Sequence, residues 1–257
     1  MKKEYVTLEQ LKILKAEENL QKCIEIRGLN TVGLPIWIIN HYIKSTCDNY
    51  NKLIYLIKII GLYSDEEIKL IDIGISTTSV PIDKDGIEFE ETVIETVLYP
   101  NEKNKIEIKW LNDNPEDFWK SFRNCERPVC VAKMENGEIV FLHNPRGPEG
   151  IKICDVSYHS PIDISFSGST GIISDLVNAG SIVRNDLRMQ DEHEARMITQ
   201  NLLTMQESIN VLDKLNNSNL PGSHKEYILQ NFNALMDKQN KLNKKLGITS
   251  PGYDHRI

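Results

Sequence analysis

A glutamate and a lysine two residues apart, in Glu107-Ile-Lys109, form the pattern with the clearest chemical meaning in this sequence. On a β-strand, residues i and i+2 point to the same face, so both side chains would face one site. A carboxylate beside a lysine can hold Mg²⁺ and polarise a reacting group, provided that a second acid joins it. Asp83 or Asp85 could supply that acid.

Restriction-type nucleases carry such an E-x-K strand, and the resemblance implies a Mg²⁺-dependent, nuclease-like hydrolase with Asp83, Glu107 and Lys109 as its candidate catalytic residues. The alternative is an ordinary amphipathic strand. Glu107 and Lys109 would then lie on its solvent side, opposite Ile106, Ile108 and Trp110. We prefer the alternative because E-x-K is a short pattern, and we therefore expect no cofactor unless the nuclease hypothesis holds.

Softer metal ligands and nucleophiles are scattered. His143, Cys154 and His159 lie near one another in sequence, but no two of them have the tight spacing of a zinc site. We therefore predict no metal centre. Cys125 and Cys130 have arginines nearby that could lower a thiol pKa, yet no histidine is associated with them, and Cys130 fits a core strand.

A strand-like run, Ile162 to Phe166, meets Gly168-Ser-Thr-Gly171, after which a helical pattern begins. The first residues of a helix can bind an anion through free backbone N–H groups. A nucleotide-binding P-loop, however, needs a lysine after its last glycine, and none follows Gly171. Gly168, Ser169, Thr170 and Gly171 are thus a candidate ligand or anion site, or a joint in which Ser169 or Thr170 caps the helix.

The composition is that of a globular protein, with 40% hydrophobic and 26% charged residues and a net charge of −7. The acidic excess lies before residue 169, which argues against nucleic acid as a partner. The longest apolar run, Leu53 to Leu62, is half of what a membrane span needs. We expect a cytoplasmic protein with no membrane association, and reduced thiols for its five cysteines.

The pattern of residues predicts an α+β body over residues 1–168. Its N-terminal part, 7–62, reads as helices: one from Thr7 to about Gly28, then two at roughly 35–46 and 49–60. Residues 68–166 are rich in strands and include a hairpin with a type I′ turn at Asn136-Gly137. A short helix should begin at Asn114, with Phe118, Trp119 and Phe122 buried. The sheet should be mainly antiparallel.

Residues 169–257 read as a helical arm: an antiparallel helical hairpin followed by a short tail. Apolar residues recur at alternating steps of four and three, which is a coiled-coil pattern that we call the heptad stripe. We expect the stripe to pack helix against helix and to mediate self-association, with Gln239 fixing the register. Its candidate interface residues are Ile198, Leu202, Met205, Ile209, Leu212, Phe232, Leu235, Gln239, Leu242 and Leu246.

No stretch matches a family signature. The plan of a mixed body, the strand Ser160 to Phe166 and a helical arm resembles, in layout, accessory proteins of bacterial and phage conflict systems, without a diagnostic motif that would assign a role to any residue. We expect a non-enzymatic interaction or regulatory protein that forms homo-oligomers and binds a protein partner. The alternatives are the nuclease-like hydrolase and a small-ligand sensor at the strand–helix junction.

Overall fold

The computed structural model describes most of the secondary structure. The described residues are 23–28, 34–65, 68, 70–76, 108–126, 128–143, 150–157, 162–179, 206–218, 220–248 and 251–252. They divide into two compact units. Described residues of unit 1 lie within Ile54–Gly150 and Lys214–Asn231, and those of unit 2 within Ala16–Leu53, Ile151–Asp213 and Phe232–Ile257. Segments from both sides of Gly168 occur in each unit, and the predicted division into body and arm stays a prediction.

One long helix, α1 (Ile36–Ser64), replaces the two helices that we predicted over residues 35–60. All residues from 48 to 60 are buried, on every face of the helix. A helix that is buried all round lies in the interior of a protein. The helical prediction for this isoleucine-rich segment is therefore confirmed, but the break between its two parts is wrong.

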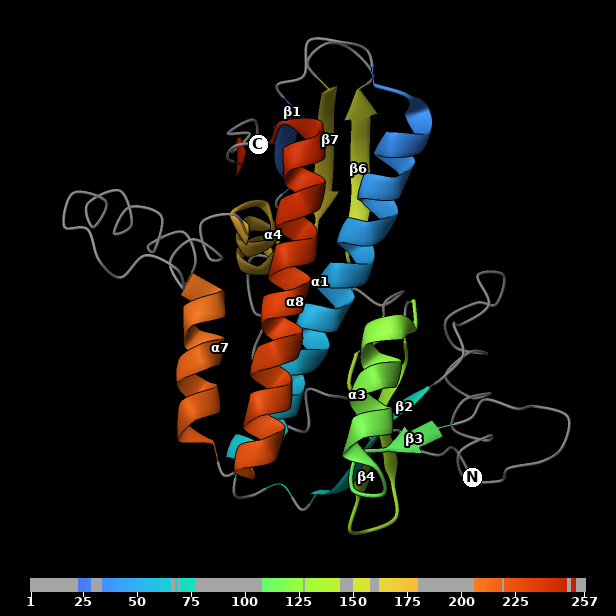
Figure 1. Ribbon diagram of the computed structural model, residues 1–257, viewed down its shortest axis with the longest axis vertical. Helices are drawn as coiled ribbons and strands as arrows, with labels where there is room; N and C mark the ends of the chain where they lie inside the picture. Colours follow the sequence, from blue (N-terminus) through green and yellow to red (C-terminus); the bar gives the residue numbers. More distant parts are fainter. Residues whose placement is uncertain are drawn as a thin grey trace, which may run out of the picture. The chain divides into compact units, whose positions relative to one another are not determined.

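Unit 1 contains an antiparallel sheet with the strand order β3-β2-β4-β5. The strands are β2 (Leu70–Ser76), β3 (Ile108–Trp110), β4 (Cys130–Met134) and β5 (Ile139–Phe141). Helix α3 (Pro115–Asn124) contacts β2 and β3, as Figure 1 shows. Asn114 caps this helix by accepting the Asp117 N–H, and α3 buries Phe118, Trp119 and Phe122, so each of these predictions is confirmed.

The hairpin between β4 and β5 is present, but its turn differs from the predicted type. The Gly137 N–H donates to the Met134 carbonyl, so Glu135 and Asn136 are the central turn residues. Gly137 follows in the left-handed region with φ of +83°. This is the pattern of a three-residue loop with a glycine bulge, because the glycine is used after the turn rather than within it.

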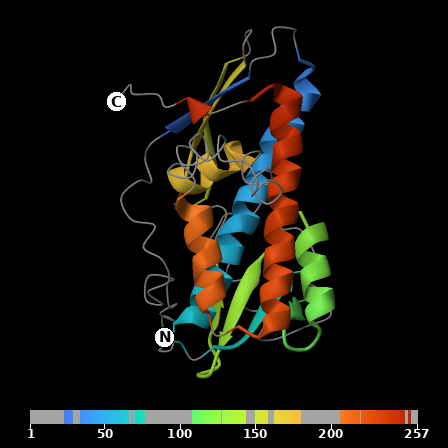
Figure 2. The ribbon, with the colours of Figure 1, turned by 60° about the vertical axis from the view of Figure 1, so that its left-hand side comes forward.

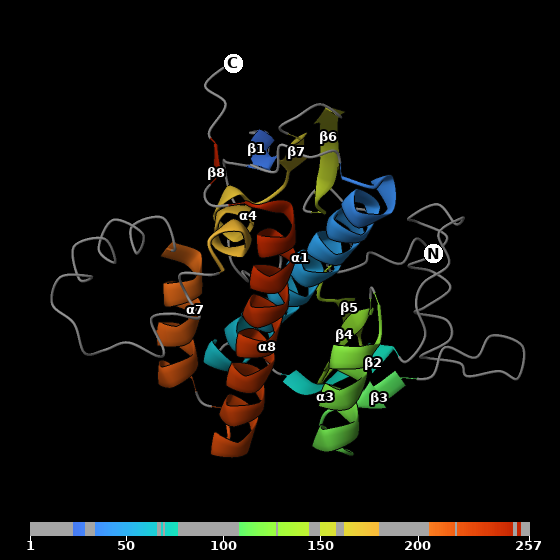
Figure 3. The ribbon, with the colours of Figure 1, turned by 45° about the horizontal axis from the view of Figure 1, so that its top comes forward.

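Unit 2 contains a second antiparallel sheet, with the order β6-β7-β1-β8. Its strands are β1 (Cys23–Gly28), β6 (Lys152–Ser157), β7 (Ile162–Ser167) and β8 (Pro251–Gly252). Figure 3 shows them next to helix α4 (Thr170–Val177), which contacts β1. The strands expected near 151–158 and 162–166 are confirmed. All described pairings in both sheets are antiparallel, which confirms the predicted α+β class.

Two segments differ from prediction. Residues 23–28 form β1 rather than the end of a helix, and residues 7–22 lie outside the described part. Cys23 to Gly28 pair with β7 along their whole length, so tertiary pairing overrides the helical spacing of Leu20 and Ile24. The tail also contributes a strand, because Pro251 and Gly252 pair with Ile26 and Glu25.

The C-terminal helices are α7 (Gln206–Asn217) and α8 (Gly222–Leu246). Helix α8 ends at Gly247, which has φ of +68°, and the Ile248 N–H donates to the Asn243 carbonyl. In unit 2 the C-terminal part of α8 runs beside the N-terminal part of α1, as Figure 2 shows. Residues 180–205 of the predicted helical arm are outside the described residues.

Replacing Gly74 by alanine should destabilise unit 1. Gly74 pairs with Trp110 across β2 and β3, and an added Cβ would lie 2.5 Å from Ile108 Cγ2 and 3.0 Å from the Trp110 ring. Such overpacking costs about 1–3 kcal/mol. Chemical denaturation should show this loss for Gly74→Ala. It should show no loss for Gly222→Ala, where nothing lies within 4 Å. Equal stability of both variants would contradict the packing argument.

Candidate functional site

The predicted metal and nuclease residues lie mostly beyond what the structure describes. Asp83, Glu107 and His159 are outside the described residues. Lys109 lies on β3, half-buried, opposite Ile75 of β2. In the described part of the chain, no group of three or more His, Cys, Asp or Glu side chains is arranged to hold a metal ion. The nuclease hypothesis stays a prediction.

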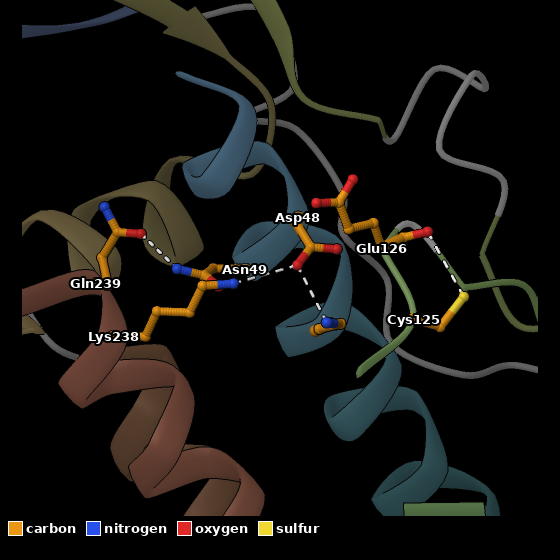
Figure 4. Close-up of polar contacts among 7 residues, drawn as sticks. Asp48, Asn49, Cys125, Glu126, Lys238 and Gln239 are labelled. Atoms are coloured by element: carbon orange, nitrogen blue, oxygen red, sulfur yellow. Dashed lines mark hydrogen bonds and ion pairs between the residues drawn. The ribbon is translucent and has the colours of Figure 1, made fainter. Parts of the chain in front are cut away.

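The thiols differ from the expected reduced set. Cys154 is disulfide-bonded, whereas Cys47, Cys125 and Cys130 are thiols that form no disulfide. Cys154 sits at an irregularity of β6, between Ile153 and Asp155, where the register to β7 shifts. Cys130 is buried in β4, as predicted, and the Cys125 thiol donates to the neighbouring Glu126 carbonyl at 3.6 Å (Figure 4). Burial, with the charge of Asp48, raises the pKa of Cys47 to about 11, so this thiol stays protonated.

At the junction of β7 and α4, the candidate anion site is closed on one side by a tyrosine. The Ser169 N–H donates to Tyr50 Oη at 2.7 Å, and Tyr50 is fully buried. Ser169 is the N-cap residue, but its own side chain makes no capping hydrogen bond. Gly168 has φ of +156°, and a Cβ there would lie 2.9 Å from Tyr50 Oη. The junction is therefore held tightly against α1, and anion binding at Gly168–Gly171 stays a prediction.

The residues of the heptad stripe that lie on α8 are buried within this chain. Its residues Phe232, Leu235, Gln239, Leu242 and Leu246 are all buried. Of the earlier stripe, Leu212 is half-buried on α7, the side chain of Ile209 is not described, and Ile198, Leu202 and Met205 lie outside the described residues. The stripe on α8 thus packs helix against helix, as its narrow shape suggested, but the partner helix in unit 2 is α1 of the same chain.

A buried hydrogen-bond network joins α1 and α8 in unit 2. Asn49 Nδ2 donates to Gln239 Oε1 at 2.8 Å, and Figure 4 shows these two side chains pointing toward each other. Gln239 Nε2 in turn donates to Thr46 Oγ1 and to Asn243 Oδ1, both at 3.0 Å. Gln239 and Asn49 have no exposed surface. Because buried amides are costly without partners, this network fixes one register of α8 on α1.

Asn243 extends the network to α4. Its Oδ1 accepts from Tyr42 Oη and Gln239 Nε2, and its Nδ2 donates to the Leu176 and Val177 carbonyls, both at 2.9 Å. An asparagine side chain has two donors and two acceptor positions, and all four are occupied here. Asn243 therefore satisfies carbonyl groups at the end of α4, which a helix end leaves without intrahelical partners.

A buried ion pair lies next to this network. Asp48 Oδ2 contacts Lys52 Nζ at 3.0 Å and Lys238 Nζ at 3.4 Å (Figure 4). The side chains of Asp48 and Lys52 are only 7% and 3% exposed, whereas that of Lys238 is 48% exposed. A buried lysine is tolerated when a carboxylate pairs with it, so Asp48 makes the position of Lys52 possible. Lys238 ties the same carboxylate to α8.

In unit 1 the most unusual ionisable group is Asp72 on β2. Its side chain is nearly buried, and its Oδ1 accepts the N–H groups of Ile73 at 2.7 Å and Asn112 at 3.1 Å. Lys133 of β4 lies directly opposite Asp72 in the sheet. Burial raises the pKa of Asp72 above its ordinary value of 3.8, although the two backbone N–H groups and Lys133 act in the other direction.

Two further titratable groups from distant segments interact with Asp72. Burial, followed by the Asp72 charge, raises the pKa of Tyr63, near the end of α1, to about 12. Burial lowers the pKa of His224 on α8 below 6.5, while the Asp72 charge opposes that shift. The charge of Asp72 therefore acts on both the tyrosine and the histidine. We call Asp72, Tyr63 and His224 the acid–base cluster.

The alternation of residues in β2 is a misleading signal for this cluster. Strict alternation in Ile71-Asp72-Ile73 predicts that Asp72 faces solvent. Asp72 is nevertheless buried together with Ile73, whereas Ile71 is 43% exposed. The register of β2 shifts between Leu70 and Asp72, and such a bulge disrupts the regular alternation of a strand.

The first turn of α1 carries the most exposed large apolar side chains among the described residues. Ile36 is 61% exposed and Trp37 is 67% exposed. Asn40, His41 and Lys44 follow on the exposed side of the same helix. Tryptophan is rarely left this open, because its burial at an interface removes a large apolar area from water.

Comparisons with protein-family models, with curated proteins and with solved structures found no match for this chain. None of the described helices is both long enough and apolar enough to cross a membrane. A proposal of function must therefore rest on the exposed first turn of α1 and on the acid–base cluster.

Replacing Gln239 by leucine should destabilise the protein by about 2–4 kcal/mol, because Asn49 and Asn243 each lose a buried partner. The loss should be smaller than additive when Asn49→Leu is combined with it, because both ends of one bond are then removed. Chemical denaturation measures both effects. Lys241→Ala, which breaks an exposed pair with Asp237, is the matched control and should change stability by less than about 0.5 kcal/mol. A similar loss in the control would contradict the role of Gln239.

Replacing Asp72 by asparagine should make the protein more stable at neutral pH. The pKa of Asp72 is raised in the folded chain, so its contribution to stability is fully present below 3.8 and is lost as pH rises through the raised pKa. Asparagine keeps an oxygen for the Ile73 and Asn112 N–H groups without the buried charge. The free energy of unfolding should favour Asp72→Asn at about pH 7, and the gain should vanish toward about pH 3. A constant difference across this range would refute the assignment.

Proposed function

We propose that this protein is an interaction or regulatory protein that self-associates, and that the exposed first turn of α1 is the contact surface. The exposure of Trp37 beside Ile36 is the single observation that carries the proposal. This surface replaces the α8 part of the heptad stripe, which is already buried against α1 of the same chain.

Charge supports a second copy of the chain as the occupant. The chain has a net charge of −7, with 37 acidic residues against 30 lysines and arginines. The face that follows Trp37 carries His41 and Lys44, and acidic groups of another copy can approach it without repulsion. An indole that inserts into an apolar site, surrounded by such polar contacts, is a common arrangement at protein interfaces. A cytoplasmic location and a further protein partner belong to the same proposal.

The acid–base cluster of unit 1 favours a second function, in which Asp72 and His224 act on a small substrate or ligand. Two titratable groups, one from α1 and one from α8, each interact with Asp72 of β2 there. Such a constellation is common at catalytic sites, but ion-pair networks of purely structural importance also produce it. Self-association is preferred because a directly exposed tryptophan supports it.

Replacing Trp37 by serine should lower the average mass of the protein in solution. Light scattering over a range of protein concentrations measures the mass, and the natural chain should show a concentration-dependent increase above 29.5 kDa. Leu229→Ser is the matched control, because Leu229 is an exposed apolar residue on α8, at 42%, and should leave self-association unchanged. A natural chain that stays at its monomer mass at every concentration, or equal effects of both variants, would refute the proposed contact.

A further inference from the structure

Among the described residues, the first two turns of α8 contact the rest of unit 1 through a ring contact, one exposed hydrogen bond and the buried side chain of Ile228. Tyr227 stacks on Trp119 of α3, with ring centroids 6.3 Å apart and planes at 16°. Lys225 Nζ donates to the Asn216 carbonyl, an exposed bond to the end of α7. By contrast, the unit 2 part of α8 is held by the buried network of Gln239 and Asn243. The two halves of α8 therefore differ in how firmly they are fixed.

His224 lies in this less firmly held segment, and one of its ring nitrogens is buried. Among the described residues, Nδ1 of His224 has no hydrogen-bond partner. A neutral imidazole has a single N–H, so it can leave Nδ1 without a proton. The imidazolium carries a proton on both nitrogens, and it would bury a charged N–H without an acceptor. Burying a charged N–H without an acceptor costs more free energy than burying a neutral nitrogen. The position of α8 in this structure, which we call the docked position, therefore favours the neutral ring of His224.

The charged groups around the His224 ring do not offset the free-energy cost of protonating it in the docked position. Asp72 of β2 is the opposing charge, but its Oδ1 is already engaged by two backbone N–H groups. Asp72 is itself surrounded by Asp113 before α3, Lys133 on β4 and Tyr63 on α1. The pKa of His224 is lowered, since its burial outweighs the attraction of Asp72.

We propose that His224 makes the first turns of α8 a proton-sensitive latch, in which protonation of its ring releases residues 222–228 from α3 and β2. The released segment exposes Trp119 and Tyr227, which cover each other in the docked state. The rest of α8 stays in place, because its network contains no group that titrates in this range. Acidification would thus open one end of a helix while the fold is retained.

The sign of the effect follows from the direction of the shift. A histidine whose pKa is lowered in the docked state contributes stability that is present above its free value of 6.5 and is lost as pH falls through the docked pKa. Asp72 acts in the opposite sense at lower pH, because its protonation relieves the cost of a buried carboxylate. The latch should therefore begin to open as pH falls below 6.5, the ordinary pKa of histidine. Protonation of Asp72, whose pKa lies above its ordinary value of 3.8, should oppose the opening at lower pH.

Hydrogen exchange of the full chain tests this proposal. Between about pH 7.5 and pH 5.5, the protection factor of amides in residues 222–228, corrected for intrinsic rates, should fall, by at most about tenfold. Amides in residues 236–243 should show no matching fall and serve as the internal control. His224→Gln, which cannot become charged, should abolish the fall. Asp72→Asn, which removes the opposing charge, should enlarge it.

An equal fall in His224→Gln, or no fall in the natural chain, would overturn the latch. A second measurement does not depend on the variants folding. Titration of the His224 ring by NMR in the natural chain should give a pKa below 6.5, and a value above it would also overturn the proposal.

Discussion

The contact between Gln239 and the polar face of α1 is the constraint on which unit 2 depends. Gln239 has no exposed surface and bonds to Asn49, Thr46 and Asn243. Apolar packing alone would allow α8 to slide by one turn along α1, since leucine and phenylalanine accept many neighbours. Buried amide groups do not allow such a shift, because sliding α8 by one turn would leave several of them without hydrogen-bond partners. The register of α8, and through Asn243 the position of α4, follows from this single set of bonds.

The two units use polar groups in different ways. In unit 2 the side chain of Gln239 bonds through both of its polar atoms, and Asn243 uses its full hydrogen-bonding capacity, whereas Asn49 Oδ1 has no partner among the described residues. In unit 1, Asp72 is held in place by backbone N–H groups but remains a costly buried carboxyl, and its neighbours include a histidine and a tyrosine. Hydrogen-bonded amides that carry no charge give rigidity, whereas an incompletely compensated titratable group is free to respond to protons. The two ends of α8 thus differ in their proposed response to pH: the first turns respond to protonation, whereas the part with Gln239 and Asn243 does not.

Local sequence signals predicted the local structure well. The cap at Asn114, the aromatic face of α3 and the hairpin at Asn136-Gly137 depend on neighbours a few residues away, and each is present. The errors arise where distant pairing decides. Cys23 to Gly28 form a strand because β7 is its pairing partner, and Asp72 is buried where the backbone N–H of Asn112, from the segment after β3, donates to it. Likewise, the heptad stripe indicated helix-on-helix packing but contained nothing to distinguish a second copy from α1. The residue types near a helix end are enough to predict its cap. The pattern within one segment, however, does not show which distant segment will pack against it.

The pairing of β1 also has a consequence for how the chain acquires its structure during synthesis. The segment that forms β1 is synthesised before its partners, because Ile26 pairs with Ile164 and with Pro251, which follow it by more than a hundred residues. Until then the backbone groups of residues 23–28 lack these partners and can pair with other chains. Contacts between such remote segments also form slowly, because long loops must close first. The second sheet can therefore be completed only after the segment of Pro251 has been synthesised.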